Sequence, residues 1–89
     1  MKHRYLEVTY RKGKPIAAYL YVPREIGTTA SRTEDAGPGL RVDFDAKGNP
    51  LGIELTAPSL VTAEQLNEVL KRLGQPPLQS AEWAPLEAA

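Results

Sequence analysis

The stretch that decides the fold is Gly37–Ser59, GPGLRVDFDAKGNPLGIELTAPS. Apolar and polar residues alternate on both sides of the turn Ala46–Asn49, which is typical of two antiparallel strands joined as a hairpin. Gly48 in the left-handed region would close this turn. The row expected to face inward contains Leu40, Val42, Phe44, Leu51, Ile53 and Leu55. The row expected to face outward contains Arg41, Asp43, Asp45, Gly52, Glu54 and Thr56.

Two further strands are expected before this hairpin. Tyr5–Tyr10 alternates with period two, and Ile16–Val22 is apolar on both faces, as in a strand covered on both sides. The turn Arg11–Pro15 would join them as a first hairpin. The segment Pro23–Gly37 reads mainly as loop, and a short edge strand at Ser31–Asp35 is an alternative.

A helix is expected after the second hairpin, over Thr62–Leu73. Thr62 and Gln65 have the spacing of a capping box, and Gly74 has the place of a C-terminal cap. The apolar stripe of this helix contains Leu66, Val69, Leu70 and Leu73. The sequence therefore predicts an α+β fold: an antiparallel meander of four or five strands with one C-terminal helix packed on one face.

The chain length and composition predict one domain over residues 1–77, followed by a tail, 78–89, that contains Trp83. Trp83 is expected to fold back on the core, and the alternatives are contact with a partner or a mobile terminus. The absence of cysteine excludes disulfides, thiolate metal sites and cysteine nucleophiles. Neither a signal peptide nor an apolar run of ~18 residues is found, so we expect a cytoplasmic protein without a membrane span.

The central hairpin resembles the DUF2283 family of small uncharacterised prokaryotic proteins. The resemblance rests on Val42-Asp43-Phe44-Asp45, on Gly48, and above all on Gly52-Ile53-Glu54-Leu55. It covers Tyr5–Ser59, and the longer TYRKGKP takes the place of the family's usual first turn. The resemblance implies no assigned activity. It implies at most an antitoxin-like role with another small protein as partner.

Charge is uneven along the chain although the net charge is zero. Residues 1–24 hold six basic residues against one acidic residue, and the remainder holds five against ten. One interpretation is nucleic-acid binding by the basic first third. The favoured interpretation is that basic strands pair with acidic strands in one sheet. The residues of the nucleic-acid alternative are Arg4, Arg11, Lys12, Lys14 and Arg41.

Catalytic and metal sites are not expected. Asp43, Asp45, Gly48 and Glu54 have the spacing of a calcium loop, but Lys47 stands where an oxygen ligand belongs and strands flank the segment. His3 is the one histidine, which excludes a two-histidine metal site within one chain. We therefore predict a non-enzymatic protein without metal or cofactor.

The face opposite the helix is predicted to be the functional surface. Tyr5, Ala17, Tyr19 and Tyr21 would lie there, and tyrosine is enriched in protein interfaces. Stacking on single-stranded bases is the alternative, although neighbouring Asp43 and Glu54 would repel phosphates. We expect a small interaction module, homodimeric through this face or through an edge strand. The candidate interaction residues are Tyr5, Tyr19, Tyr21 and Trp83.

Overall fold

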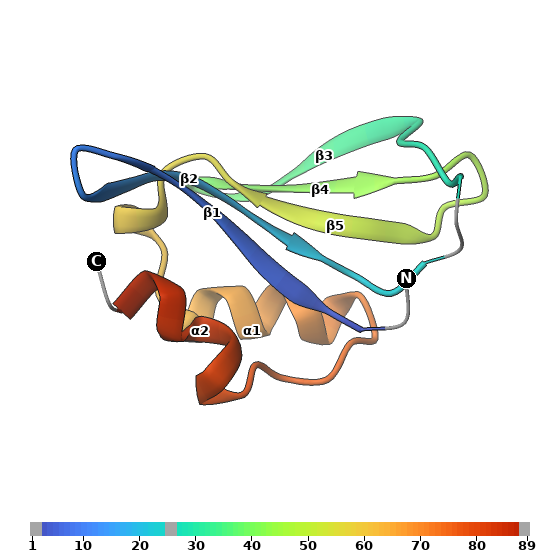
Figure 1. Cartoon of the computed structure of the whole chain (residues 1–89). Coiled ribbons are helices and arrows are strands. Elements are labelled where there is room, and N and C mark those ends of the chain that lie inside the picture. The colour runs from blue at the N-terminus through green and yellow to red at the C-terminus, as the bar shows by residue number, and fades with distance from the viewer. Residues whose placement is uncertain (1–2, 25–26, 88–89) are drawn as a thin grey trace.

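The computed structural model describes residues 3–24 and 27–87 (Figure 1). It forms one five-stranded antiparallel sheet with two helices on one face. The strands are β1 (Tyr5–Arg11), β2 (Lys14–Tyr21), β3 (Arg32–Gly37), β4 (Leu40–Phe44) and β5 (Pro50–Leu55). The helices are α1 (Ala63–Arg72) and α2 (Ser80–Glu87), preceded by the short 3₁₀ turn η1 (Pro58–Leu60). The α+β class is confirmed. Among the described helices, none is long and apolar enough to cross a membrane.

The predicted meander is wrong, because the strand order is β1-β2-β5-β4-β3. The strand β2 pairs with β5, placing Leu20 opposite Ile53, and Ile53 in turn opposite Val42 of β4. The physical reason lies in burial. In β5, the residues Leu51–Ile53 are all buried, so this strand belongs in the centre of the sheet. The charged β3 is largely exposed and forms an edge, where charge discourages further pairing.

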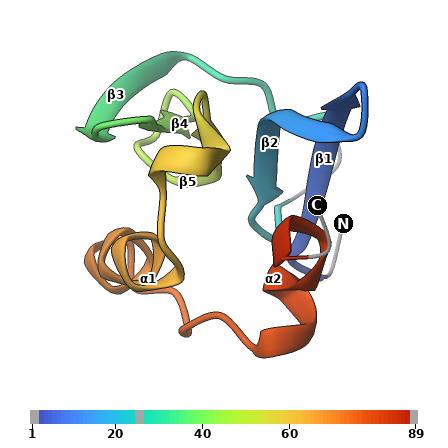
Figure 2. The ribbon, with the colours of Figure 1, turned by 90° about the vertical axis from the view of Figure 1, so that its left-hand side faces the viewer.

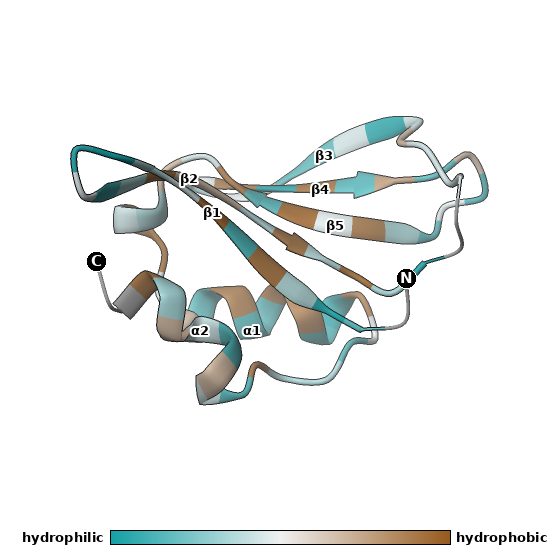
Figure 3. Cartoon of the chain, in the orientation of Figure 1, coloured by the Kyte–Doolittle hydropathy of each residue, from teal (hydrophilic) through white to brown (hydrophobic). Residues whose placement is uncertain are grey.

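The predicted inward rows form the core. Figure 3 shows apolar and polar bands alternating along the strands and around α1. Phe44, Leu6 and Val8 pack at the margin of the core. The buried cluster consists of Ala18, Leu20, Leu40, Val42, Ile53, Leu55, Val61, Leu66, Val69 and Leu70. The segment Pro23–Gly37, predicted to be mainly loop with an edge strand at Ser31–Asp35 as the alternative, contains the edge strand β3, Arg32–Gly37.

The helix α1 agrees with its predicted boundaries. Thr62 is its N-cap and Leu73 its C-cap, and Gly74 has a φ of 73°. Both hydrogen bonds of the capping box are present: the Gln65 N–H donates to Thr62 Oγ1 over 3.1 Å, and the Thr62 N–H donates to Gln65 Oε1 over 2.9 Å. The capping box therefore fixes where the chain turns from the sheet into the helix layer.

Replacing Thr62 with alanine is expected to lower the free energy of unfolding by about 1 kcal/mol, because the Gln65 N–H loses its acceptor. Urea denaturation of the two proteins measures the difference. Thr62→Ser keeps the hydroxyl and should stay within a few tenths of a kcal/mol of the parent. Equal losses in both variants would contradict the cap assignment.

The prediction of a single helix is also wrong, since α2 forms within the predicted tail. Its sequence, SAEWAPLE, contains Pro85 and has no apolar stripe, so periodicity gives no signal. Trp83 folds back against the core, as predicted, together with Leu86. Figure 2 shows α1 beneath β4 and β5, and α2 beneath β1 and β2. The two helices leave the opposite face of the sheet without a helix.

Candidate functional site: the outer face of the sheet

The outer face is the side of the sheet opposite α1 and α2 (Figures 1 and 2). Strand register brings residues from all five strands together in two rows across this face. The first row runs through Glu7, Tyr19, Glu54, Arg41 and Asp35. The second row runs through Tyr5, Tyr21, Gly52, Asp43 and Thr33. The aromatic rings therefore lie in the β1–β2 half, beside Glu7, and the other half contains Glu54, Asp43, Asp35 and Arg41.

Three tyrosines are in contact on this face and form the tyrosine cluster: Tyr5, Tyr21 and Tyr19. The rings of Tyr5 and Tyr21 stack with centroids 4.6 Å apart and an interplanar angle of 17°. The rings of Tyr21 and Tyr19 are also 4.6 Å apart, tilted by 53°. Aromatic pairs at these distances attract each other beyond their buried area. Tyr5, at the sheet edge, is 46% exposed and presents the accessible end of the cluster.

Gly52 explains how Tyr19 reaches the acidic half of the face. A Cβ atom at position 52 would lie 2.2 Å from Cε1 of Tyr19, so the ring lies directly over the glycine. The Tyr19 hydroxyl then donates to Asp43 Oδ2 over 2.7 Å. Sequence reasoning placed Gly52 on this face without assigning it a role. The available signal was a glycine in the middle of a strand, which marks a close approach by another group.

The hydroxyls of Tyr19 and Tyr21 are hydrogen-bond donors and stay protonated. Burial and the hydrogen bond to Asp43 raise the pKa of Tyr19 far above its usual value. Burial and the Glu7 carboxylate raise the pKa of Tyr21, whose hydroxyl lies 3.4 Å from Glu7 Oε1. A phenolate nucleophile or a neutral-pH tyrosine base is disfavoured by these shifts.

In the two rows of the outer face, acidic side chains outnumber basic ones, since Arg41 is the basic residue among them. The guanidinium of Arg24 already lies over the ring of Tyr21, 5.5 Å from its centroid, which is cation–π geometry. The carboxylates of Glu7, Glu54 and Asp43 lie in the two rows beside the rings. Phosphate groups would meet a largely negative field on this face.

Trp83 and the tyrosine cluster lie on opposite sides of the sheet. Trp83 belongs to α2 and packs against the core, so the four predicted interaction residues do not form one surface. The remaining tyrosine, Tyr10, is on the helix side, where its hydroxyl donates to the Pro85 carbonyl. The structure thus brings together three of the four predicted residues.

The five residues of the nucleic-acid alternative lie in three separate places. Arg4 is only 10% exposed and pairs with Glu82 over 2.7 Å. Its guanidinium also donates to the carbonyls of Pro76 and Pro77. Arg11, Lys12 and Lys14 are exposed at the β1–β2 hairpin tip, Arg11–Lys14. Arg41 is on the outer face, 3.6 Å from Asp35.

The acidic residues of the central hairpin also separate. Asp43 is on the outer face, but Asp45 lies beyond the end of β4 and holds the turn. Its carboxylate accepts hydrogen bonds from the N–H groups of Lys47 and Asn49, both at 2.8 Å. Hydrogen bonds from Asn49 are the main reason why the pKa of Asp45 lies below its usual value. Within residues 3–24 and 27–87, no cluster of three or more metal-ligating side chains is present.

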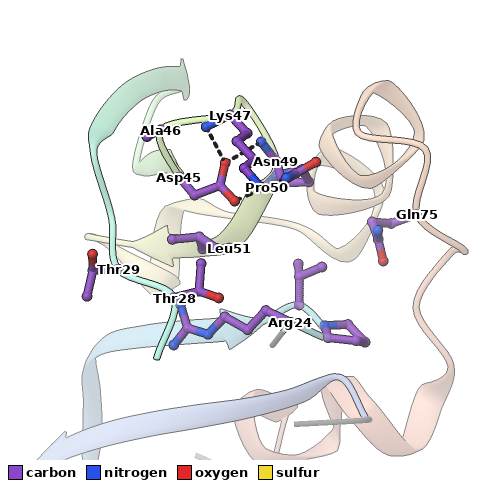
Figure 4. Close-up of a pocket in the computed structure, with 12 residues that line it drawn as sticks. Arg24, Thr28, Thr29, Asp45, Ala46, Lys47, Asn49, Pro50, Leu51 and Gln75 are labelled. Carbon is purple, nitrogen blue, oxygen red and sulfur yellow. Dashed lines mark hydrogen bonds between the residues drawn. The ribbon is translucent and has the colours of Figure 1, made fainter. Parts of the chain in front are cut away.

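An open cavity of about 610 Å³ lies between the segment Val22–Arg24 that follows β2, the residues Thr28 and Thr29, and the β4–β5 turn (Figure 4). Asp45 is the carboxylate among its described lining residues, and the turn already uses that group. Lys47, the other proton-exchanging side chain among the described lining residues, is exposed on the same turn. The outer face therefore remains the better candidate site.

Comparison with family models, with curated proteins and with solved structures found no match. The resemblance to the DUF2283 family therefore stays a prediction from the residues of the central hairpin.

Proposed function

We propose that this protein is a small, cytoplasmic, non-enzymatic interaction module that forms a homodimer. Its contact surface comprises the tyrosine cluster and the adjoining sheet edge. The same surface would serve a contact with another small protein, which is the role implied by the resemblance to the DUF2283 family. The proposal requires neither a cofactor nor a metal ion.

The observation that carries this proposal is the ordered tyrosine cluster on a face without a helix. Its rings are held by mutual stacking and by carboxylates that accept from two of the hydroxyls. Fixed aromatic side chains lose little conformational entropy on binding, and tyrosine is frequent among the residues that dominate interface energies. A sheet face that only contacts water does not need three tyrosines in mutual contact.

Sedimentation velocity over a concentration series tests the proposal. We expect the wild-type protein to sediment as a dimer at tens of micromolar, and Tyr5→Ala to shift the equilibrium toward monomer because it removes the accessible ring. Leu60→Ala is the matched control, since Leu60 is an exposed apolar residue (65%) in η1, away from the outer face. A wild-type protein that remains strictly monomeric at these concentrations would refute self-association.

Nucleic-acid binding is the second candidate, favoured by the three exposed cations at the hairpin tip. Single-stranded DNA titrated at increasing salt concentrations would distinguish it, because phosphate contacts weaken steeply with ionic strength. Two observations favour protein contact instead: Arg4 is sequestered by Glu82, and the tyrosines lie among carboxylates.

A further inference from the structure

The two edges of the sheet differ in how they are protected. The strand β3 has three charges in six residues, at Arg32, Glu34 and Asp35, and its pairing shifts between Asp35 and Gly37. Charges and irregular pairing are the usual protection of an edge strand. The edge strand β1 is longer, and its central residues Leu6–Tyr10 contain a single charge, at Glu7. The pairing of β1 with β2 also shifts, between Thr9 and Tyr10, but the extra residue at that shift, Ile16, belongs to β2 and not to the edge strand.

We propose that β1 of a second copy of this chain pairs antiparallel with β1, about a two-fold axis at Thr9, and joins the two sheets into one. The proposal rests on the self-association proposed above and specifies its geometry. Glu7 lies opposite Arg11 of the partner subunit, and Val8 lies opposite Tyr10 of the partner subunit. Thr9 faces Thr9 of the partner subunit on the axis.

Charge complementarity selects this register. A two-fold axis perpendicular to the sheet keeps outer-face residues opposite outer-face residues. Because successive strand residues alternate between the two faces, such an axis must pass through a residue of β1 and not between two residues. An axis at Glu7 would place two carboxylates opposite each other, which is destabilising. An axis at Val8 would pair Glu7 with a threonine. The axis at Thr9 forms two Glu–Arg pairs and one Thr–Thr pair, and both kinds of pair stabilise antiparallel sheets.

The same arrangement uses the outer face. It places the basic hairpin tip of the partner subunit beside Tyr5 and Glu7, at the accessible end of the tyrosine cluster. The cluster already holds one guanidinium, that of Arg24 over Tyr21. Both helix layers then lie on one side of the joined sheet, because the axis is perpendicular to it. The cationic tip and the anionic aromatic face thus become partners across the dimer.

Charge reversal tests this geometry. Glu7→Arg and Arg11→Glu should each raise the dimer dissociation constant about tenfold or more, since each turns two attractive pairs into repulsive ones. The double variant Glu7→Arg/Arg11→Glu restores both pairs and should return to within about threefold of wild type. Glu34→Arg on the opposite edge is the matched control and should leave the constant unchanged. Circular dichroism checks that each variant is folded. The milder substitution Glu7→Gln should raise the dimer dissociation constant by less than Glu7→Arg does.

A single introduced cysteine gives an independent test, because the chain has no cysteine of its own. Thr9→Cys, treated with the thiol oxidant diamide, should form a covalent dimer on a non-reducing gel. Thr33→Cys, an exposed threonine on the other edge strand, should not.

The outcomes separate the two proposals. A strictly monomeric wild-type protein overturns both. A dimer that the single charge reversals do not weaken, or that the double variant does not restore, overturns the β1 pairing and leaves self-association standing. Equal cross-linking of the two cysteine variants likewise overturns the β1 pairing.

Discussion

Replacing Arg4 with alanine is expected to lower the free energy of unfolding by about 2–3 kcal/mol. The guanidinium joins the start of β1 to α2: it donates to both oxygens of Glu82, at 2.7 and 2.9 Å, and to the carbonyls of Pro76 and Pro77. Removing one partner of a buried ion pair leaves the other charge without compensation, at a cost of about 3–5 kcal/mol. The expected value is lower here because Glu82 retains 20% exposure.

Trp83 provides a local readout of this change, since it is the only tryptophan and lies next to Glu82 in α2. Loss of the ion pair should shift its fluorescence to longer wavelength at denaturant concentrations where the sheet is still folded. Lys47→Ala, which removes an exposed cation from the β4–β5 turn, should change the free energy of unfolding by less than about 0.5 kcal/mol. An Arg4→Ala protein as stable as Lys47→Ala would show that α2 is held without this ion pair.

The dependence on pH has a defined sign. The Arg4 guanidinium holds the pKa of Glu82 below its usual value of 4.5, so the folded state binds this proton less tightly than the unfolded state does. The stability that the ionised Glu82 carboxylate adds to the folded state is therefore fully present above about pH 4.5. This stability is lost as the pH falls through the lowered pKa. Glu82→Gln removes this titration. The stability difference between wild type and Glu82→Gln should accordingly shrink on acidification, and a difference independent of pH would contradict the assignment.

The hairpins and α1 were predictable because their signals are local. Alternation with period two identified the rows of β4 and β5, and the Thr62–Gln65 capping box placed the start of α1. The pairing of β2 with β5 was not predictable in this way. It depends on which strand buries enough apolar surface to lie in the centre of the sheet, and the order of the strands along the chain does not reveal this. The strand β5, whose segment Leu51–Ile53 is fully buried, takes the central position, and the charged β3 takes the edge.

The candidate site was predictable only from strand parity, that is, from the alternation of successive strand residues between the two faces of the sheet. Parity placed Tyr5, Tyr19 and Tyr21 on one face, and the structure brings them into contact. Parity could not place Trp83, because α2 has no periodic pattern. Nor could it show that Arg4 is sequestered, since its partner Glu82 is 78 residues away in the chain. Side-chain ion pairs between distant segments leave no periodic signal in a single sequence.

Replacing Gly52 with alanine is expected to cost about 2 kcal/mol, through its effect on Tyr19. The new methyl group would lie 2.2 Å from Cε1 and 2.6 Å from Cζ of that ring, so the ring must move. Its movement breaks the hydrogen bond to the Asp43 carboxylate, a charged acceptor worth about 1.5–3 kcal/mol. It also disturbs the contact with Tyr21, worth about 0.5–1.5 kcal/mol. The better strand propensity of alanine over glycine offsets about 0.5–1 kcal/mol of this loss.

A double-mutant cycle isolates this mechanism. In a Tyr19→Ala background no ring lies over position 52, so Gly52→Ala should be neutral or stabilising by up to about 1 kcal/mol. In a Tyr21→Ala background the Tyr19 ring remains, and Gly52→Ala should still destabilise. Urea denaturation of the six proteins supplies the coupling energy. Equal effects of Gly52→Ala in both backgrounds would mean that the glycine serves the backbone rather than the ring. If the Tyr19 background alone rescues the substitution, Gly52 is the residue that lets an aromatic ring cross the sheet and reach Asp43.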